Sequence, residues 1–277
     1  MAITAQDVNK LRKHTGAGMM DCKKALVEAD GDFDEAIVIL RKKGQKVSAS
    51  RAGRTTTEGM VFVETNADRT EATLIALNCE TDFVAMNEDF QGLGKLILKT
   101  ALENKPASIE DLLNLKVDGL SLADTITENI GKIGEKLEVS AYETVKADQV
   151  VPYIHTGSKL GVLVALAGVN GEDESEAGKN VGMQIAAMNP VAVDKDGIDQ
   201  SIIDKEIQLG KEMALAEGKP EAIIEKIAMG KLNKFFKDNT LLNQAYVKDP
   251  SLTVAKYLDS VKRGMTVSSF KRIAIGG

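Results

Sequence analysis

The chain has 277 residues, of which 43% are apolar and 27% are charged, and its formal net charge is −6. This balance is typical of a chain that folds around a core, and it argues against intrinsic disorder. The longest uncharged apolar run, residues 160–169, has about half of the roughly 20 residues that a membrane span needs. The first residues lack the apolar stretch of a signal peptide. We therefore expect a cytoplasmic protein with no membrane contact.

Cysteine and histidine are scarce. The two cysteines are Cys22 and Cys79, the two histidines are His14 and His155, and no CxxC or HExxH spacing occurs. These counts exclude a disulfide scaffold and argue against a zinc site, and we expect no metal and no cofactor. Tryptophan is absent, aromatic residues make up 4%, and the chain is acidic, so we expect no direct binding of nucleic acid.

The charge is unevenly distributed along the chain. Residues 1–54 contain eleven Lys or Arg and seven Asp or Glu, whereas the remaining residues contain 24 and 34. This change of sign predicts a separate basic N-terminal module, residues 1–45, attached to an acidic body.

Helical spacing predicts three short helices in the N-terminal module. The first starts at Thr4, the second covers residues 19–29, and the third starts at Asp32 and is closed by Gly44. Met20 lies nearly opposite the apolar face of the second helix, and Met19 lies at the edge of that face. Two interpretations stay open, since these methionines either fill space or form a binding surface.

The body has a different pattern. After a polar, basic linker at residues 46–57, two strands around a turn and a helix are predicted at residues 60–101, and the same order recurs at residues 150–188. Further strands are expected at residues 136–146 and 265–274. These elements predict an α+β fold with two related subdomains, residues 58–140 and 141–277, each an antiparallel sheet with helices.

A helical hairpin is predicted inside the second subdomain, at residues 200–236. Gly218 suits the end of its first helix and Pro220 suits the start of its second, and so short a joint makes the helices antiparallel. The hairpin either packs only on itself or serves as a docking arm.

One loop carries unusual residues. Asn78 to Asn87 should connect a strand to a helix, and it contains Phe83 and Val84 beside two acids. In a structural interpretation, Asp82 stabilises the N-terminus of the helix and Phe83 anchors the loop in the core. In a functional interpretation, the carboxylate and the ring form a rigid wedge that enters a partner.

Three segments resemble a known family. They are TGAGMMDCKKAL at residues 15–26, ETDFVA at residues 80–85 and HTGSKLGVLV at residues 155–164. In this order they closely resemble bacterial elongation factor Ts, the family of nucleotide-exchange factors for elongation factor Tu. The resemblance implies a ubiquitin-associated-like three-helix module, a core of two related subdomains and a helical hairpin.

The resemblance also implies roles for single residues. Arg12, Met19 and Met20 match positions that contact the GTP-binding domain of the partner. Asp82 and Phe83 match the pair that displaces the partner's Mg²⁺, with Thr81 and Val84 beside them. Ile133, Gly134 and His155 match further contact positions. The sequence after Gly134 departs from the family, because the usual Asn and Arg of that segment are missing.

The function implied by the resemblance is guanine-nucleotide exchange on elongation factor Tu in its GDP-bound and nucleotide-free forms. Such a factor performs no covalent chemistry, and it could form a homodimer or a 2:2 complex through the core or the hairpin. Two other classes are kept as alternatives. One is a ubiquitin-associated-like adaptor without exchange activity, and the other is a hydrolase or transferase, for which two distant histidines are poor material.

Overall fold

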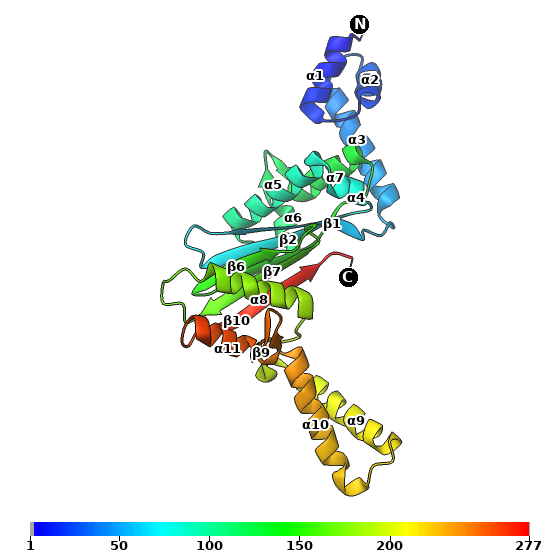
Figure 1. Ribbon diagram of the computed structural model, residues 1–277. Coiled ribbons are helices and arrows are strands. Elements are labelled where there is room, and N and C mark those ends of the chain that lie inside the picture. Colours follow the sequence, from blue (N-terminus) through cyan, green and yellow to red (C-terminus); the bar gives the residue numbers. More distant parts are fainter. Residues whose placement is uncertain (1–2, 277) are drawn as a thin grey trace.

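The computed structural model describes residues 3–276. Residues 1, 2 and 277, which fall within the predicted N-terminal module and the predicted second subdomain, lie outside the described residues. The molecule is elongated: three N-terminal helices form one end, two sheets with their helices form the middle, and a pair of long helices forms the other end (Figure 1). Among residues 3–276, the structure contains no helix that is both long and apolar enough to traverse a bilayer.

The N-terminal bundle consists of α1 (Ala5–Thr15), α2 (Met19–Glu28) and α3 (Phe33–Arg51). Thr4 starts α1 with a capping box, in which its hydroxyl accepts from the amide of Asp7 and the Asp7 carboxylate accepts from the amide of Thr4. Gly16 ends α1 with a φ of 67°, which a residue with a side chain rarely adopts. The small core of the bundle is made of Val8, Leu11, Cys22, Ala25, Leu26 and Ala36.

The third helix is longer than its sequence pattern indicates. The prediction that Gly44 closes it is wrong, because α3 continues to Arg51 through the first half of the segment expected to be a linker. Gly44 lies inside the helix where α3 crosses α7 (Leu122–Ile133), and a Cβ added to Gly131 on α7 would be 2.6 Å from the Gly44 Cα. Gly44 is therefore explained by this close helix contact.

Two three-stranded antiparallel sheets form the middle of the molecule. The first contains β1 (Glu58–Thr65), β2 (Glu71–Cys79) and β5 (Glu138–Lys146) in the order β1-β2-β5. The second contains β6 (Gln149–Ile154), β7 (Leu160–Ala167) and β10 (Thr266–Ala274) in the order β10-β7-β6. In each sheet a hairpin supplies an edge strand and the central strand, and a later strand pairs on the other side of the centre.

The boundary predicted between residues 140 and 141 passes through β5. Because β5 pairs with β2 along its length, the whole strand belongs to the first sheet. We propose that the first subdomain extends to Lys146.

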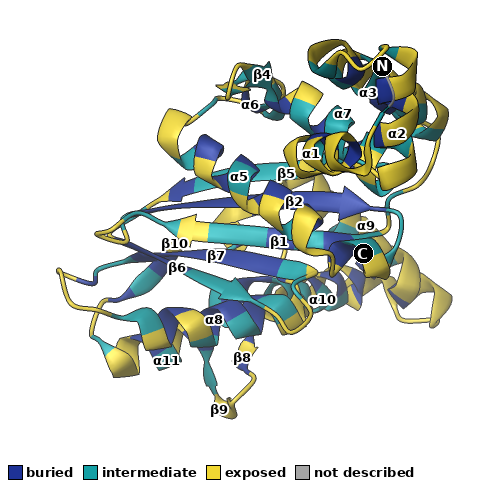
Figure 2. Ribbon diagram, turned by 90° about the horizontal axis from the view of Figure 1, so that it is seen from above, coloured by how far each residue is buried: buried dark blue, intermediate teal, exposed yellow. Residues whose placement is uncertain are grey.

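The two sheets pack face to face, and helices cover both outer faces (Figure 2). All residues of β2 are buried, since alternate side chains enter different cores. Ile75 and Leu77 contact the helix-covered core, whereas Leu74 and Ala76 contact the other sheet. The outer helices are α5 (Glu88–Asn104), α6 (Ile109–Asn114) and α7 on the first sheet, and α8 (Ser175–Met188) and α11 (Val254–Val261) on the second. This mixture confirms the predicted α+β class.

Several elements were not predicted from the sequence. They are α6, α7, α11, the two-residue strands β3 (Lys116–Val117) and β4 (Leu120–Ser121), and the pair β8 (Ala245–Tyr246) and β9 (Asp249–Thr253). Of these, α7 matters most for the functional site, because it carries Ile133 and packs against α3.

The helical hairpin projects from the second subdomain (Figure 1). It consists of α9 (Gln200–Ala216) and α10 (Glu221–Asn239), joined through Gly218 at a φ of 69°. At its base, the buried side chain of Gln184 on α8 donates to Gln244 and to the carbonyl of Ala245, which follow the hairpin in the chain. A buried, hydrogen-bonded amide pair holds the base of the hairpin against the second subdomain.

The close contact between α3 and α7 generates the first prediction. We expect Gly131→Ala to lower the free energy of unfolding by about 1–3 kcal/mol, because the new methyl meets backbone that cannot rotate away. Gly92→Ala on α5 is the matched control: no atom lies within 4 Å of its Cβ position, so removing a helix glycine should stabilise by roughly 0.5–1 kcal/mol. Urea denaturation measures both, and equal stability of Gly131→Ala and the parent chain would contradict the contact.

A polar clamp between the two sheets generates the second prediction. The Asp173 carboxylate accepts from Ser175, from Arg69 at 2.6 Å and from Gln149 at 2.8 Å, and these bonds hold the pKa of Asp173 well below its usual range. A lowered pKa in the folded state stabilises above the unfolded pKa of about 4 and loses that effect as the pH falls. We expect Asp173→Asn to lower the melting temperature slightly at pH 7. The difference in melting temperature between the variant and the parent chain should shrink as the pH falls below about 4. A difference that stays constant with pH would contradict this prediction.

Candidate functional site

The loop after β2 forms an exposed tip. Its centre is the single-turn helix α4 (Asp82–Ala85), capped by the Thr81 hydroxyl, which accepts from the amide of Val84 at 3.4 Å. Ala85 is buried and Val84 packs against the core, whereas Asp82 and Phe83 face solvent. The Phe83 side chain is 83% exposed. The structural interpretation, in which Phe83 anchors the loop in its own core, is therefore wrong.

Met86 belongs to the same surface. It lies one helical turn after Phe83 and is 75% exposed. Phe83 and Met86 are the exposed large apolar side chains between residues 52 and 187, a range that the structure describes in full. Met86 was not predicted from the sequence as a site residue, although its spacing of three residues from Phe83 is typical of neighbours on one helix face. We call Asp82, Phe83 and Met86 the exposed tip.

One carboxylate holds the loop from below. Glu135 follows Gly134, the C-cap of α7. Its carboxylate accepts three hydrogen bonds from the two residues that precede Asp82. They come from the amide of Glu80 at 3.2 Å, the amide of Thr81 at 3.0 Å and the hydroxyl of Thr81 at 2.7 Å. The backbone immediately before Asp82 is thus fixed by a residue 55 positions away from Glu80 in the chain.

A second carboxylate holds the loop in the opposite direction. Glu80 accepts from the amide of Lys136 at 2.8 Å and from Nη1 of Arg51, which lies 3.2 and 3.0 Å from its two oxygens. Glu80 and Glu135 therefore bind each other's neighbouring backbone. We call this pair of carboxylates and their donors the reciprocal brace. Charge-assisted bonds of this kind are stronger than bonds between neutral groups.

A buried thiol lies under the tip. The Cys79 Sγ donates to the carbonyl of Thr81 at 3.1 Å. Burial, followed by the nearby carboxylates of Glu135 and Glu58, raises the pKa of Cys79 to about 12. The thiol therefore stays protonated at neutral pH and acts as a donor in the support of the loop, not as a nucleophile.

The other residues singled out in the core lie at the same end of the sheets. Gly134 ends α7 with a φ of 83° directly before Glu135, and Ile133 packs against the core. His155 follows β6 and is exposed, with its Nδ1 2.9 Å from the hydroxyl of Tyr153. The turn after His155 is tied to this end, because Lys159 forms an ion pair with Glu58, which is paired with Cys79 across β1 and β2.

Arg12, Met19 and Met20 lie in the bundle and not next to the exposed tip. All three are exposed, and the side chains of Met19 and Met20 are 52% and 62% accessible. None of them belongs to the core of the bundle. The structure thus distributes the predicted contact residues over two bodies, the bundle and one end of the sheets, which α3 connects (Figure 1).

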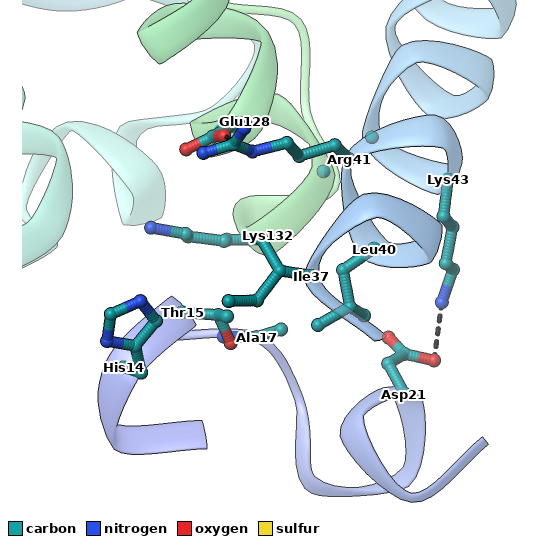
Figure 3. Close-up of a pocket in the computed structure, with 12 residues that line it drawn as sticks. His14, Thr15, Ala17, Asp21, Ile37, Leu40, Arg41, Lys43, Glu128 and Lys132 are labelled. Atoms are coloured by element: carbon teal, nitrogen blue, oxygen red, sulfur yellow. Dashed lines mark hydrogen bonds and ion pairs between the residues drawn. The ribbon is translucent and has the colours of Figure 1, made fainter. Parts of the chain in front are cut away.

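A cavity of about 120 Å³ lies at the seam between the bundle and α7 (Figure 3). Its charged walls are largely paired, since Arg41 contacts Glu128 at 2.7 Å and Lys43 forms an ion pair with Asp21. Glu128 belongs to α7, so the first of these pairs attaches α3 to the core. We interpret the cavity as the seam between two packed bodies.

Catalytic and metal-binding groups are not gathered at any of these places. His14 is in the bundle and His155 is in the turn between β6 and β7. Within residues 3–276, no cluster of three or more His, Cys, Asp or Glu side chains is arranged to hold a metal ion. What the exposed tip offers to solvent is an aromatic ring and a thioether beside a carboxylate.

Comparison with known proteins places this architecture in a family. The family model described as Elongation factor TS matches residues 80–277, which begin at Glu80 of the reciprocal brace. A protein named Elongation factor Ts from Amoebophilus asiaticus is 59% identical over 276 residues, which cover 100% of both chains. Proteins of the same name from Cytophaga hutchinsonii and Flavobacterium psychrophilum are 55% and 52% identical, and the alignments cover 99% of each chain. The chain therefore belongs to the elongation factor Ts family of translation elongation factors.

Proposed function

We propose that this chain is a guanine-nucleotide exchange factor for elongation factor Tu. It binds the GDP-bound partner, displaces its Mg²⁺ and promotes release of GDP, and it leaves when GTP binds. The observation that carries this proposal is an acid and an aromatic ring, Asp82 and Phe83, held outward on a braced loop in a member of this family.

Such a factor needs no nucleotide site of its own. A GTPase retains GDP because backbone amides, a lysine and Mg²⁺ neutralise the phosphates. A protein that binds the metal-free or nucleotide-free partner better than the loaded one must weaken GDP binding by the same factor, because the coupling between two ligands is reciprocal. This chain therefore promotes release through differential binding, without covalent chemistry.

The size of the effect requires several contacts. Speeding GDP release 10⁴-fold, as an order of magnitude, requires the barrier to fall by about 5.5 kcal/mol. One exposed contact supplies less than this, so the exposed tip, the bundle and the second sheet act together. In this proposal Phe83 separates packed elements of the partner, Asp82 adds negative charge beside its Mg²⁺ site, and Met86 widens the apolar contact. Thr81 and Val84 support Asp82 and Phe83 from the side that faces the core.

The remaining contact residues supply binding energy. Arg12, Met19 and Met20 contact the GTP-binding domain of the partner through the bundle. Ile133, Gly134 and His155 contribute from the end of the sheets that carries the tip. Methionine suits such a contact because its flexible, polarisable side chain adapts to an irregular surface.

The third prediction tests the exposed tip. We expect Asp82→Ala with Phe83→Ala to keep the fold, because both side chains are exposed, and to reduce the maximal rate of GDP release roughly 30- to 100-fold, or about 2–3 kcal/mol. Stopped-flow release of a fluorescent GDP from elongation factor Tu measures this rate. Asp196→Ala with Val261→Ala, an exposed acid and an exposed apolar residue of the second subdomain, is the control and should release GDP at the parent rate. A tip variant within twofold of the parent would contradict the wedge.

The fourth prediction separates the bundle from the tip. We expect Met19→Ala with Met20→Ala to raise the concentration of factor needed for half-maximal release by about 5- to 30-fold, as removal of roughly 1–2 kcal/mol of uniform binding does. The maximal rate should stay unchanged. Val38→Ala, an apolar residue of α3 that is 37% exposed, is the control. An adaptor without exchange activity would leave GDP release at its spontaneous rate in all of these assays.

A further inference from the structure

Helix α3 is attached at three places along one rigid element. Its 19 residues span about 28 Å at 1.5 Å per residue. Its first half belongs to the bundle, where Ala36 is fully buried and Phe33, Ile37 and Leu40 pack around the same core. The first half of α3 is therefore part of the bundle, and the direction of α3 sets where the bundle lies.

The middle of α3 is fixed to α7. At the crossing, the backbones of Gly44 and Gly131 approach so closely that neither helix can slide without a clash. One turn earlier, Arg41 contacts Glu128 of α7 at 2.7 Å (Figure 3). Steric contact and an ion pair thus set the angle and the register of α3 on the core.

The last residue of α3 contacts the support of the exposed tip. Arg51 is paired with Glu80, whose side chain is only 15% exposed and also accepts from the amide of Lys136. Glu80 in turn donates its own amide to Glu135, which holds Thr81. Two residues beyond Glu80, the chain reaches Asp82. The path from the bundle to the tip thus consists of one helix and three consecutive polar contacts.

We infer that Arg51 is a positioning residue that ties the N-terminal bundle to the exposed tip, with α3 as the strut between them. When a partner binds the bundle, α3 holds Arg51, and Arg51 holds Glu80 and the start of the loop at a fixed place relative to the docked surface. This inference rests on the proposed function. It assigns to Arg51 an effect on the rate of GDP release through the tip, not a contact with the partner.

The geometry favours this role over that of an ordinary surface pair. Exposed ion pairs contribute little, since solvent screens them. Glu80 is mostly shielded, and its carboxylate accepts from the backbone amide of Lys136 as well as from Arg51. The carboxylate is therefore held in one position, and it transmits the position of Arg51 to the loop. A tip held in the productive place loses less freedom when it enters the partner.

The test is the kinetics of GDP release with Arg51→Ala in the full chain. We expect the maximal rate to fall roughly 5- to 20-fold, within the range of coupling between two sites, while the concentration for half-maximal release changes less than twofold. Arg51→Lys should restore most of the rate, because a single nitrogen of Arg51 makes both contacts to Glu80. Lys46→Ala, which removes an exposed charge from the same helix, is the control and should match the parent chain.

A double variant separates positioning from stability. Arg51→Met with Glu80→Gln removes both charges and keeps an oxygen that can accept from the amide of Lys136. We expect the melting temperature of this double variant to lie near that of the parent chain, while its maximal rate of GDP release stays as low as that of Arg51→Ala. A rate that recovers together with stability would overturn the inference. So would a rate within twofold of the parent in Arg51→Ala.

A measurement without the partner keeps the two proposals apart. In Arg51→Ala, we expect the amide of Lys136 to exchange with deuterium at least fivefold faster than in the parent chain, because its acceptor is no longer held. An exchange rate of the Lys136 amide equal to that of the parent chain would overturn the positioning role of Arg51. If the parent chain does not speed up GDP release from elongation factor Tu, the proposed function is wrong. If the parent and Arg51→Ala speed up release equally, only the role of Arg51 is wrong.

Discussion

Two carboxylates, Glu80 and Glu135, are the constraint on which the exposed tip of this molecule depends. Each accepts hydrogen bonds from the backbone beside the other, and together they receive donors from the loop after β2, from the segment after α7 and from the end of α3. Val84 and Ala85 anchor the loop in the core after the exposed ring, and the polar contacts of the brace fix the residues before it. The brace does this with charged acceptors, and these form the stronger class of hydrogen bond.

The layered core explains how these groups meet. β2 is buried on both faces, by helices on one side and by the second sheet on the other, so its last residue, Cys79, is a fixed starting point for the loop. α7 lies on the same outer core and ends beside that point, where Gly134 turns the chain so that Glu135 follows. The backbone of the tip is therefore anchored to the packed layers under it, although the ring itself is solvated.

Local patterns in the sequence predict the strands and helices of this fold well, and long-range contacts explain what they miss. The helical hairpin was expected at residues 200–236 and extends to Asn239, and the core strands differ from their predicted bounds by only a few residues. Phe83 was found because an aromatic residue in a polar loop is unusual. Glu80, Glu135 and Arg51 leave no such signal, since acids and arginines are common on surfaces and these partners are 29 to 55 residues apart. The prediction that Gly44 ends the third helix was wrong because glycine, which often ends helices, also permits two helices to cross closely.

An exposed aromatic ring is a liability for a protein by itself, and under the proposed exchange function a ring on a braced loop gains a use. Binding energy from a large, smooth contact would hold loaded and empty partners alike and would shift no equilibrium. A projecting ring and carboxylate favour only the partner form that has opened to receive them, provided that they do not fold back when they meet resistance. In the proposed function, stiffness under the tip converts affinity into release of nucleotide, and the bundle and the sheets supply binding energy without themselves touching the partner's metal.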